Sequence, residues 1–190
     1  MSQFDLFFHL GLKHILNIDA ADHLLFLLAL TAIFKLKDWK HLLAMVSLFT
    51  VSHTLSLAAS AYGWVKTSDY WVELGIVLTI IITALSNLFV KNHKTAVQWH
   101  LTFAFLFGLI HGMGFAHAFL MISQGYKSKL YSLLVFALGV ETGQVIVIVL
   151  IVAVLSIVFR RLLKTGEKTL TVGSVFFILG YSLSLLIDRI

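Results

Sequence analysis

The chain of 190 residues contains no cysteine and no proline. Without cysteine it can form neither disulfides nor thiolate metal sites, and it has no cysteine nucleophile. Without proline, any break in a helix must depend on residues such as Gly, Asn or Asp. Charged residues make up only 12% of the chain, against roughly 25% in soluble domains. Hydrophobic residues make up 59%, and the sequence therefore indicates an integral membrane protein.

Six long apolar runs predict an all-α protein with six transmembrane helices, because a spanning helix needs about 20 predominantly apolar residues. The runs cover residues 20–35, 42–62, 71–90, 99–122, 131–158 and 170–187. A shorter apolar segment, 4–16, comes before them and is too short to span. Its Asp5, His9 and Lys13 form one polar stripe, so we expect an interfacial or re-entrant helix. The connections are short, which predicts a single transmembrane domain over residues 1–190.

Basic residues gather in alternate loops. Three loops contain Lys35, Lys37, Lys40, Lys91, Lys94, Arg160, Arg161, Lys164 and Lys168. The other two contain only Lys66, Lys127 and Lys129. The positive-inside rule places the first set in the cytoplasm, so six spans put both termini outside. We expect a multi-pass protein of a bacterial-type inner (plasma) membrane, and the net charge of +5 gives no reason to expect a nucleic-acid partner.

The two halves of the chain, about 4–90 and 99–188, resemble each other. The matched segments are 10–14 with 107–111, 22–23 with 116–117, 49–54 with 137–142, Gly75 with Gly173, and 85–86 with 183–184. The predicted topology runs the paired spans in opposite directions, which favours an inverted repeat of two three-helix halves. Transporters commonly have this plan, with the site at the repeat interface. Chance similarity between leucine-rich helices is the alternative.

Ionisable residues within the predicted spans are few, and each is a candidate functional residue because a bilayer makes it costly. They are His14, Asp19, Asp22, His23, His53, His111, His117 and Glu141. Imidazole and carboxylate groups together suit a divalent transition metal, so we treat all eight as candidate metal ligands. Capping of a helix start would explain one of the two aspartates. Solvation explains the remaining histidines in or beside the cytoplasmic loops, which are His41, His93 and His100.

His53 and Glu141 correspond to each other in the repeat and are expected as a pair near the membrane midplane. Ser52 lies beside His53, and Gln144 shares a helix face with Glu141, so both are supporting candidates. A lone glutamate so far from the end of a span needs a cation, a proton or a buried partner.

Gly112 and Gly114 lie between His111 and His117. Two glycines weaken a helix and would allow an interrupted segment of the kind seen in transporters. Close packing of helices through small residues is the alternative. The sequence contains no GxSxG, phosphate-loop or HExxH motif, and we assign no catalytic residue.

Several longer motifs are also present. They are GLKHIL (11–16), DHLLFLL (22–28), FTVSHTLSL (49–57), FGLIHGMGF (107–115) and GVETGQ (139–144). On these motifs the whole chain resembles the HupE/UreJ family, and most closely its second subgroup. The family comprises membrane proteins named for hydrogenase and urease accessory operons. The run from Asp19 to His23 also looks like the His-and-Asp motif of nickel/cobalt permeases. The resemblance implies a nickel or cobalt transporter, because urease and hydrogenase need nickel.

The expected function is therefore transmembrane transport of a divalent transition-metal ion through a His/Asp/Glu-lined site between two inverted halves. Nickel and cobalt are favoured, and zinc and copper stay open. The first alternative is an intramembrane zinc-dependent hydrolase, in which three histidines and an aspartate hold the metal and Glu141 acts as general base. The second is a non-transporting metal-binding accessory protein. The expected partners are the lipid bilayer and the metal ion, and homo-oligomerisation stays open.

Overall fold

The computed structural model describes residues 2–18, 21–90 and 92–189, and these form helices and connecting segments without any β-strand. The helices are α1 (Gln3–Leu16), α2 (Asp22–Thr31), η2 (Leu36–Asp38), α3 (Trp39–Ala61), α4 (Asp69–Phe89), α5 (His93–Gly114), α6 (Ala116–Ser123), α7 (Lys129–Val154), η3 (Leu155–Leu162) and α8 (Glu167–Arg189). The predicted all-α fold is confirmed.

Five helical segments of the described chain are long and apolar enough to cross a membrane. They are Leu36–Ala61, Asp69–Phe89, His93–Gly114, Lys129–Phe159 and Glu167–Ile187. The sixth predicted span, 20–35, is not confirmed, because its helix α2 has only 10 residues. At 1.5 Å per residue α2 is about 15 Å long, roughly half the thickness of a bilayer's hydrocarbon core.

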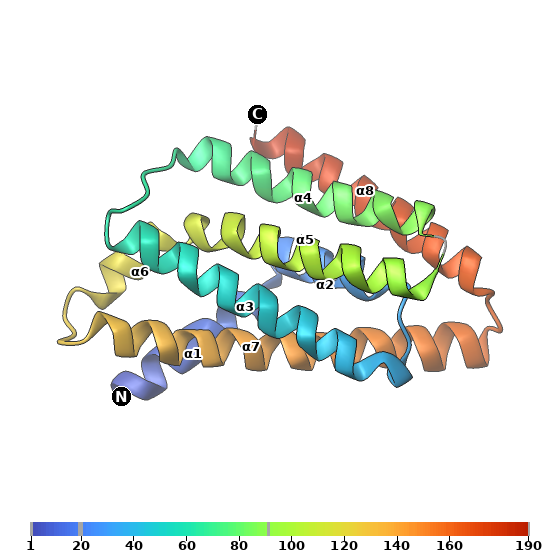
Figure 1. Cartoon of the computed structure of the whole chain (residues 1–190), viewed down its shortest axis with the longest axis horizontal. Helices are drawn as coiled ribbons and strands as arrows, with labels where there is room; N and C mark the ends of the chain where they lie inside the picture. The colour runs from blue at the N-terminus through green and yellow to red at the C-terminus, as the bar shows by residue number, and fades with distance from the viewer. Residues whose placement is uncertain (1, 19–20, 91, 190) are drawn as a thin grey trace.

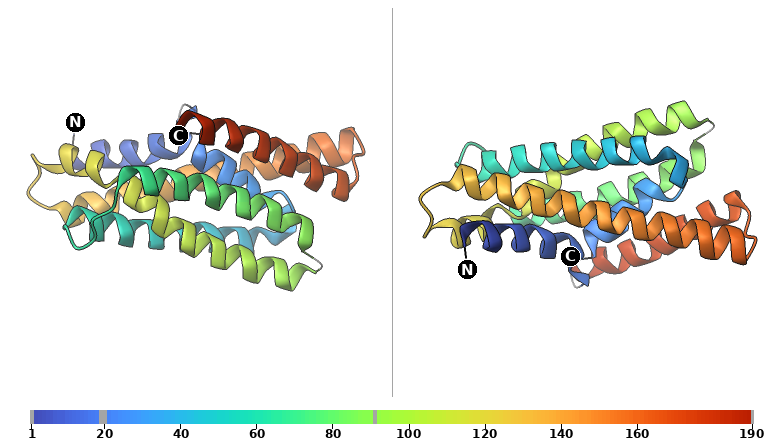
Figure 2. Two further views of the ribbon diagram at one scale, coloured as in Figure 1. Left: turned by 90° about the horizontal axis from the view of Figure 1, so that it is seen from above. Right: turned by 90° about the horizontal axis from the view of Figure 1, so that it is seen from below.

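Two helix breaks lie beside candidate histidines. The first separates α1 from α2, and the backbone of Asn17 is already extended there, with φ −70° and ψ 116°. Figures 1 and 2 show that α2 continues along the long axis of the molecule in the same general direction as α1. The second break follows Gly114, so that the predicted span 99–122 is divided into α5 and α6.

Helix α5 lies directly against the backbone of α3, and glycine makes this approach possible. A Cβ atom on Gly108 would lie 2.6 Å from the carbonyl oxygen of Phe49 and would collide with Ser52 Oγ. One turn later, a Cβ on Gly112 would collide with Ser56 Oγ and with the carbonyl oxygen of His53. The small-residue explanation therefore holds for Gly112, in the way that membrane helices commonly approach one another.

Helix α1 lies against α7 in a similar way. A Cβ on Gly11 would lie 2.9 Å from the backbone nitrogen of Val140, and it would collide with the carbonyl oxygen of Phe136. On the facing helix, a Cβ on Gly139 would lie 2.9 Å from the backbone nitrogen of Leu12. The α1–α7 and α3–α5 contacts are the most extensive in the molecule.

The remaining long helices, α4 and α8, pack on each other along one side of the molecule, while α1 and α7 lie on the opposite side (Figure 1). Helix α2 lies between them and contacts both α4 and α7. The ends of the helices that carry the larger set of basic residues are gathered at one end of the molecule, where α3, α5 and α8 begin (Figure 1).

We predict that Gly108→Ala destabilises the fold. The added Cβ forces α5 away from α3, and overpacking of this kind costs about 1–3 kcal/mol. Gly180→Ala in α8 is the matched control, because no atom lies within 4 Å of its Cβ position and alanine is the better helix former by about 1 kcal/mol. Thermal unfolding in detergent should give a lower melting temperature for the first variant only. Equal melting temperatures for the two variants would contradict the close contact.

Candidate metal centre

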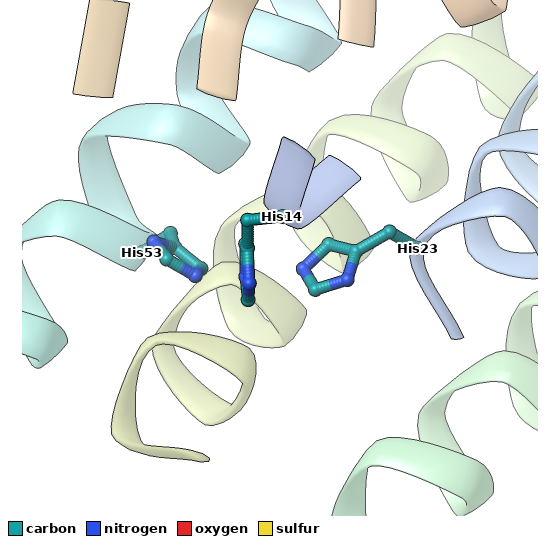
Figure 3. Close-up of side chains that lie close together, drawn as sticks. All are labelled: His14, His23 and His53. Carbon is teal, nitrogen blue, oxygen red and sulfur yellow. The ribbon is translucent and has the colours of Figure 1, made fainter. Parts of the chain in front are cut away.

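Four histidine side chains from four helices meet beside the break between α1 and α2. His14 comes from the last turn of α1 and His23 from the first turn of α2, while His53 and His111 lie within α3 and α5. The ring centroid of His23 lies 4.6 Å from that of His14 and 5.0 Å from that of His111. Figure 3 shows the imidazole of His14 between those of His53 and His23. We call these four residues the core histidine cluster.

The nitrogen atoms of the cluster are close enough to share one ion. One ring nitrogen from each of His14, His23 and His53 lies within 4.8 Å of the other two. Nitrogens that bind one tetrahedral metal ion at about 2.1 Å are roughly 3.4 Å apart. Small rotations of the three imidazole rings would bring their nitrogens to this spacing. His111 supplies a fourth imidazole beside His23.

Most of these nitrogens are buried without a hydrogen-bond partner in the described part of the chain. They are His14 Nε2, His23 Nε2, and both ring nitrogens of His53 and of His111. A buried polar atom left unsatisfied costs about 1–3 kcal/mol, and a group of them needs an explanation. A divalent transition-metal ion fits, because neutral imidazole lone pairs are among its preferred ligands.

Phenylalanine rings enclose the core histidine cluster. Phe49 and Phe136 are fully buried, and their rings are nearly parallel to that of His53, at interplanar angles of 27° and 26°. Phe115 lies 4.4 Å from His14 between ring centroids. An apolar shell of this kind limits the approach of water and holds the imidazole rings in place.

Asp22 lies next to His23 and is held by an arginine from the far end of the chain. Arg189 Nη2 donates to Asp22 Oδ2 at 2.8 Å, and both side chains are largely buried, at 23% and 12% exposure. Arg189 Nη1 also donates to the backbone carbonyl oxygen of Glu73 at 3.3 Å. The other oxygen, Asp22 Oδ1, is buried without a partner in the described chain. A metal ion at Asp22 would therefore compete with the guanidinium group.

The other predicted ligands lie elsewhere. Asp19 lies outside the described residues. His117 is exposed on α6 rather than buried with the other histidines. Glu141 on α7 accepts a hydrogen bond of 2.5 Å from Ser47 Oγ on α3. Glu141 is therefore paired with Ser47, six residues before the predicted partner His53, and the α7 side chain that lies beside His53 is Phe136.

The supporting residues have structural roles near the cluster. Ser52 Oγ donates to the carbonyl oxygen of Phe49 within α3. Gln144 is buried and its Oε1 accepts a 2.9 Å hydrogen bond from Thr50 Oγ1, which joins α7 to α3. Gly112 lies beside the backbone of His53, and Gly114 is the last residue of α5.

His100 departs from the sequence-based expectation, which assigned it to the solvated end of a span. It is fully buried, and its Nε2 lies 2.9 Å from Asn87 Oδ1. Asn87 Nδ2 donates in turn to the carbonyl oxygen of Ala29, so the two side chains connect α5, α4 and α2. The structure begins α5 at His93, six residues before the predicted span 99–122, so that His100 lies inside the helix rather than at its end. Nothing in the sequence connects Arg189 with Asp22.

A surface hollow leads to the core histidine cluster from one side. Its lining consists of Leu10, Lys13, His14, Leu16, Asn17 and Phe115. His14 is thus both a member of the cluster and part of the wall of the hollow. This geometry gives an ion a short route to one imidazole before it reaches the others.

Comparison with models of known protein families matches residues 1–188 of the chain to the family described as HupE / UreJ protein. No curated protein and no solved structure matches the chain.

We predict that Arg189→Gln increases the affinity of the protein for Ni²⁺ or Co²⁺. The substitution removes the cation that competes for Asp22, and we expect about a tenfold tighter dissociation constant, equivalent to 1.4 kcal/mol. Isothermal titration calorimetry of the detergent-solubilised protein measures this directly. Arg161→Gln is the control, because it removes the same charge from an exposed position in η3. An unchanged or weaker affinity in Arg189→Gln would exclude the proposed competition.

Proposed function

Because the chain belongs to the HupE / UreJ family, we propose that it transports a divalent transition-metal ion, nickel or cobalt, across the membrane through its core histidine cluster. The observation that carries this proposal is the group of imidazole nitrogens that have no hydrogen-bond partner among the described residues, within a bundle of apolar helices. Ionisable groups at such a position are costly and mark pathways for ions or protons.

The core histidine cluster suits a divalent first-row metal ion, and membership of the HupE / UreJ family favours nickel or cobalt among these. Imidazole binds nickel, zinc, copper and iron, whereas soft thiolate ligands favour copper(I), and the chain has no cysteine. The nearby carboxylate of Asp22 is neutralised by Arg189, so the centre presents little net negative charge. A transported ion must be bound strongly enough to enter and weakly enough to leave, and neutral exchangeable ligands meet both conditions.

The proposed route begins at the hollow beside His14 and passes through the core histidine cluster. From there, polar side chains continue between α3 and α7 toward the end of the molecule where α3 begins. Thr50 pairs with Gln144, and Ser47 pairs with Glu141. The α3 members of these pairs lie three and six residues before His53. Glu141 is therefore proposed as a later contact of the ion on this route.

We also propose that the two halves form an inverted repeat. Three observations support it: Gly11 and Gly108 occupy matched positions, each lies against the facing helix of the other half, and the matched helices run in opposite directions along the molecule (Figure 1). The contacts favour a register in which Phe49 corresponds to Phe136, one residue from the match with Ala137 made on sequence. His53 then corresponds to Val140 rather than to Glu141.

In this proposal α1 and α2 together make one discontinuous crossing. Six crossings then place both termini on the outer side of a bacterial-type plasma membrane, with the lysine-rich segments inside. The helix break between His14 and His23 places candidate ligands at an interruption of a crossing, as discontinuous helices do at the binding sites of transporters. The hydrolase alternative gains no support, since Glu141, its expected general base, is hydrogen-bonded to Ser47.

We predict that His53→Ala abolishes metal uptake. His53 has both ring nitrogens available to the core histidine cluster, and loss of one ligand in a transition-metal site removes most of its affinity. The measurement is Ni²⁺ or Co²⁺ uptake into proteoliposomes, where at least a tenfold lower initial rate is expected. His117→Ala is the matched control, because His117 is exposed on α6 and its loss should leave the rate unchanged.

Two results would count against transport. Equal uptake by the wild type, by His53→Ala and by empty liposomes would exclude it. Binding of metal by the wild type without any uptake would instead indicate a metal-binding accessory protein. A reduced rate in His117→Ala equal to that in His53→Ala would overturn the assignment of the centre to the core histidine cluster.

We predict that single cysteines report the proposed orientation. The chain has no cysteine of its own, so a membrane-impermeant maleimide has no background target. Lys66→Cys lies in the exposed connection between α3 and α4 and should react in intact cells. Lys37→Cys, in the exposed segment between α2 and α3, should react only after the cells are made permeable. The reverse pattern would invert the topology.

A further inference from the structure

A second group of possible ligands lies where α3 and α5 begin, away from the core histidine cluster. It consists of Asp38 at the end of η2, His41 in the first turn of α3, and His93 at the start of α5. His41 precedes His53 by twelve residues on α3, which corresponds to about 18 Å along the helix. The two groups therefore cannot share an ion.

The side chains of this second group already point toward one another. One potential ligand atom from each of Asp38, His41 and His93 lies within 4.8 Å of the other two. His93 Nε2 lies 3.1 Å from Asp38 Oδ1. The rings of His41 and His93 have centroids 5.4 Å apart. Because both histidines are exposed, their rings can rotate by the small amount that a shared ion requires.

Asp38 is the fixed member of the group. It is buried, with 8% of its surface exposed, and its Oδ2 accepts a 2.9 Å hydrogen bond from the backbone nitrogen of Lys35. This bond orients the carboxylate so that Oδ1 faces His93. A carboxylate held in this way loses little conformational freedom when it binds a metal, and its own orientation is set by a hydrogen bond, as in many metal sites.

The surrounding charge limits how strongly this group can hold a cation. Lys37 and Lys40 lie in the same segment, and two helix N-termini, which carry partial positive charge, also lie close by. The ammonium group of Lys35 is paired with Glu167, which offsets part of this charge. Exposure to solvent screens the remainder and leaves coordination positions for water.

We propose that Asp38, His41 and His93 form a second binding site for a divalent transition-metal ion, weaker than the core histidine cluster and open to solvent. Imidazole and carboxylate ligands together suit nickel, cobalt and zinc. Metal binding at this site does not depend on transport. Its role rests on the proposed function: the site receives the ion at the end of the molecule where the lysine-rich segments lie, and releases it to the solution there.

The site also connects two separate segments of the chain. An ion bound to Asp38 and His93 would link the connection before α3 to the start of α5, in addition to the contacts that α5 already makes with α3 and α4. Binding of metal should therefore stabilise the protein against thermal unfolding by mass action.

The test is the number of Co²⁺ ions bound per chain, measured by equilibrium dialysis on the full-length protein purified without a polyhistidine tag. The wild type should bind two ions with different affinities. His41→Ala and His93→Ala should each remove the weaker ion and leave the tighter one. Asp38→Asn keeps an oxygen that can accept from the Lys35 nitrogen but removes the charge, and it should weaken the second ion by about tenfold or more.

A variant with both His14→Ala and His53→Ala isolates the second site, because the core histidine cluster then lacks two ligands. It should bind one weak Co²⁺ ion, which is lost on addition of His93→Ala. If the wild type binds only the ion that His93→Ala removes, the second site stands and the transport proposal fails. Should the double variant not fold, the loss of one ion from the wild type in His93→Ala still decides the question.

His9→Ala is the matched control, since His9 is an exposed histidine on α1 outside both groups. Binding should be unchanged in this variant. The proposal is overturned if His41→Ala and His93→Ala bind as many ions as the wild type. It is also overturned if His9→Ala loses the weak ion equally, because this result would indicate unspecific binding to surface histidines.

Discussion

The close approach of glycine-bearing helices is the constraint on which the centre of this protein depends. At Gly108 and Gly112, α5 lies against the backbone of α3, and at Gly11 and Gly139, α1 and α7 lie against each other. These contacts position three histidines of the cluster: His53 and His111 lie on the α3–α5 pair, and His14 lies on α1 of the α1–α7 pair. Larger residues at these glycines would separate the helices by the width of a side chain, and imidazoles on separate helices could no longer share one ion.

The same constraint explains why most of the imidazole nitrogens have no hydrogen-bond partner among the described residues. In a membrane helix the backbone donors and acceptors are used within the helix, and the hydroxyls of Ser52 and Ser56 at the α3–α5 contact also donate to backbone carbonyl oxygens of α3. A histidine directed into this space finds rings such as Phe49 and Phe136 instead of hydrogen-bonding groups. Among the described residues, Asp22 is the carboxylate next to the core histidine cluster in sequence, and Arg189 already occupies one of its oxygens.

Sequence reasoning predicted the helices and named the four clustered histidines, because apolar runs and costly polar residues are visible without contacts. It did not predict which polar residues meet. The match of His53 with Glu141 depended on a weak alignment, and in the proposed repeat the glycine contacts favour a register one residue away, in which Phe49 corresponds to Phe136. The partners of Glu141 and Asp22, which are Ser47 and Arg189, depend on tertiary packing between distant segments. The apolar run 20–35 was counted as a span, but the helix within it begins only at Asp22 and ends at Thr31, which leaves 10 residues.

The two tight helix pairs also limit how the core histidine cluster can change. His53 and His111 lie on α3 and α5, whose backbones are in contact, so their separation is fixed by that pair. His14 lies on α1, which is fixed against α7. The distance between the backbones of His14 and His53 can therefore change only if the α1–α7 pair moves relative to the α3–α5 pair. The hydrogen bonds from Ser47 to Glu141 and from Thr50 to Gln144 cross between the pairs, so such a movement must break or re-form them. The polar pairs Ser47–Glu141 and Thr50–Gln144 thus lie along the proposed route, and they also lie at the α3–α7 contact that such a movement would change.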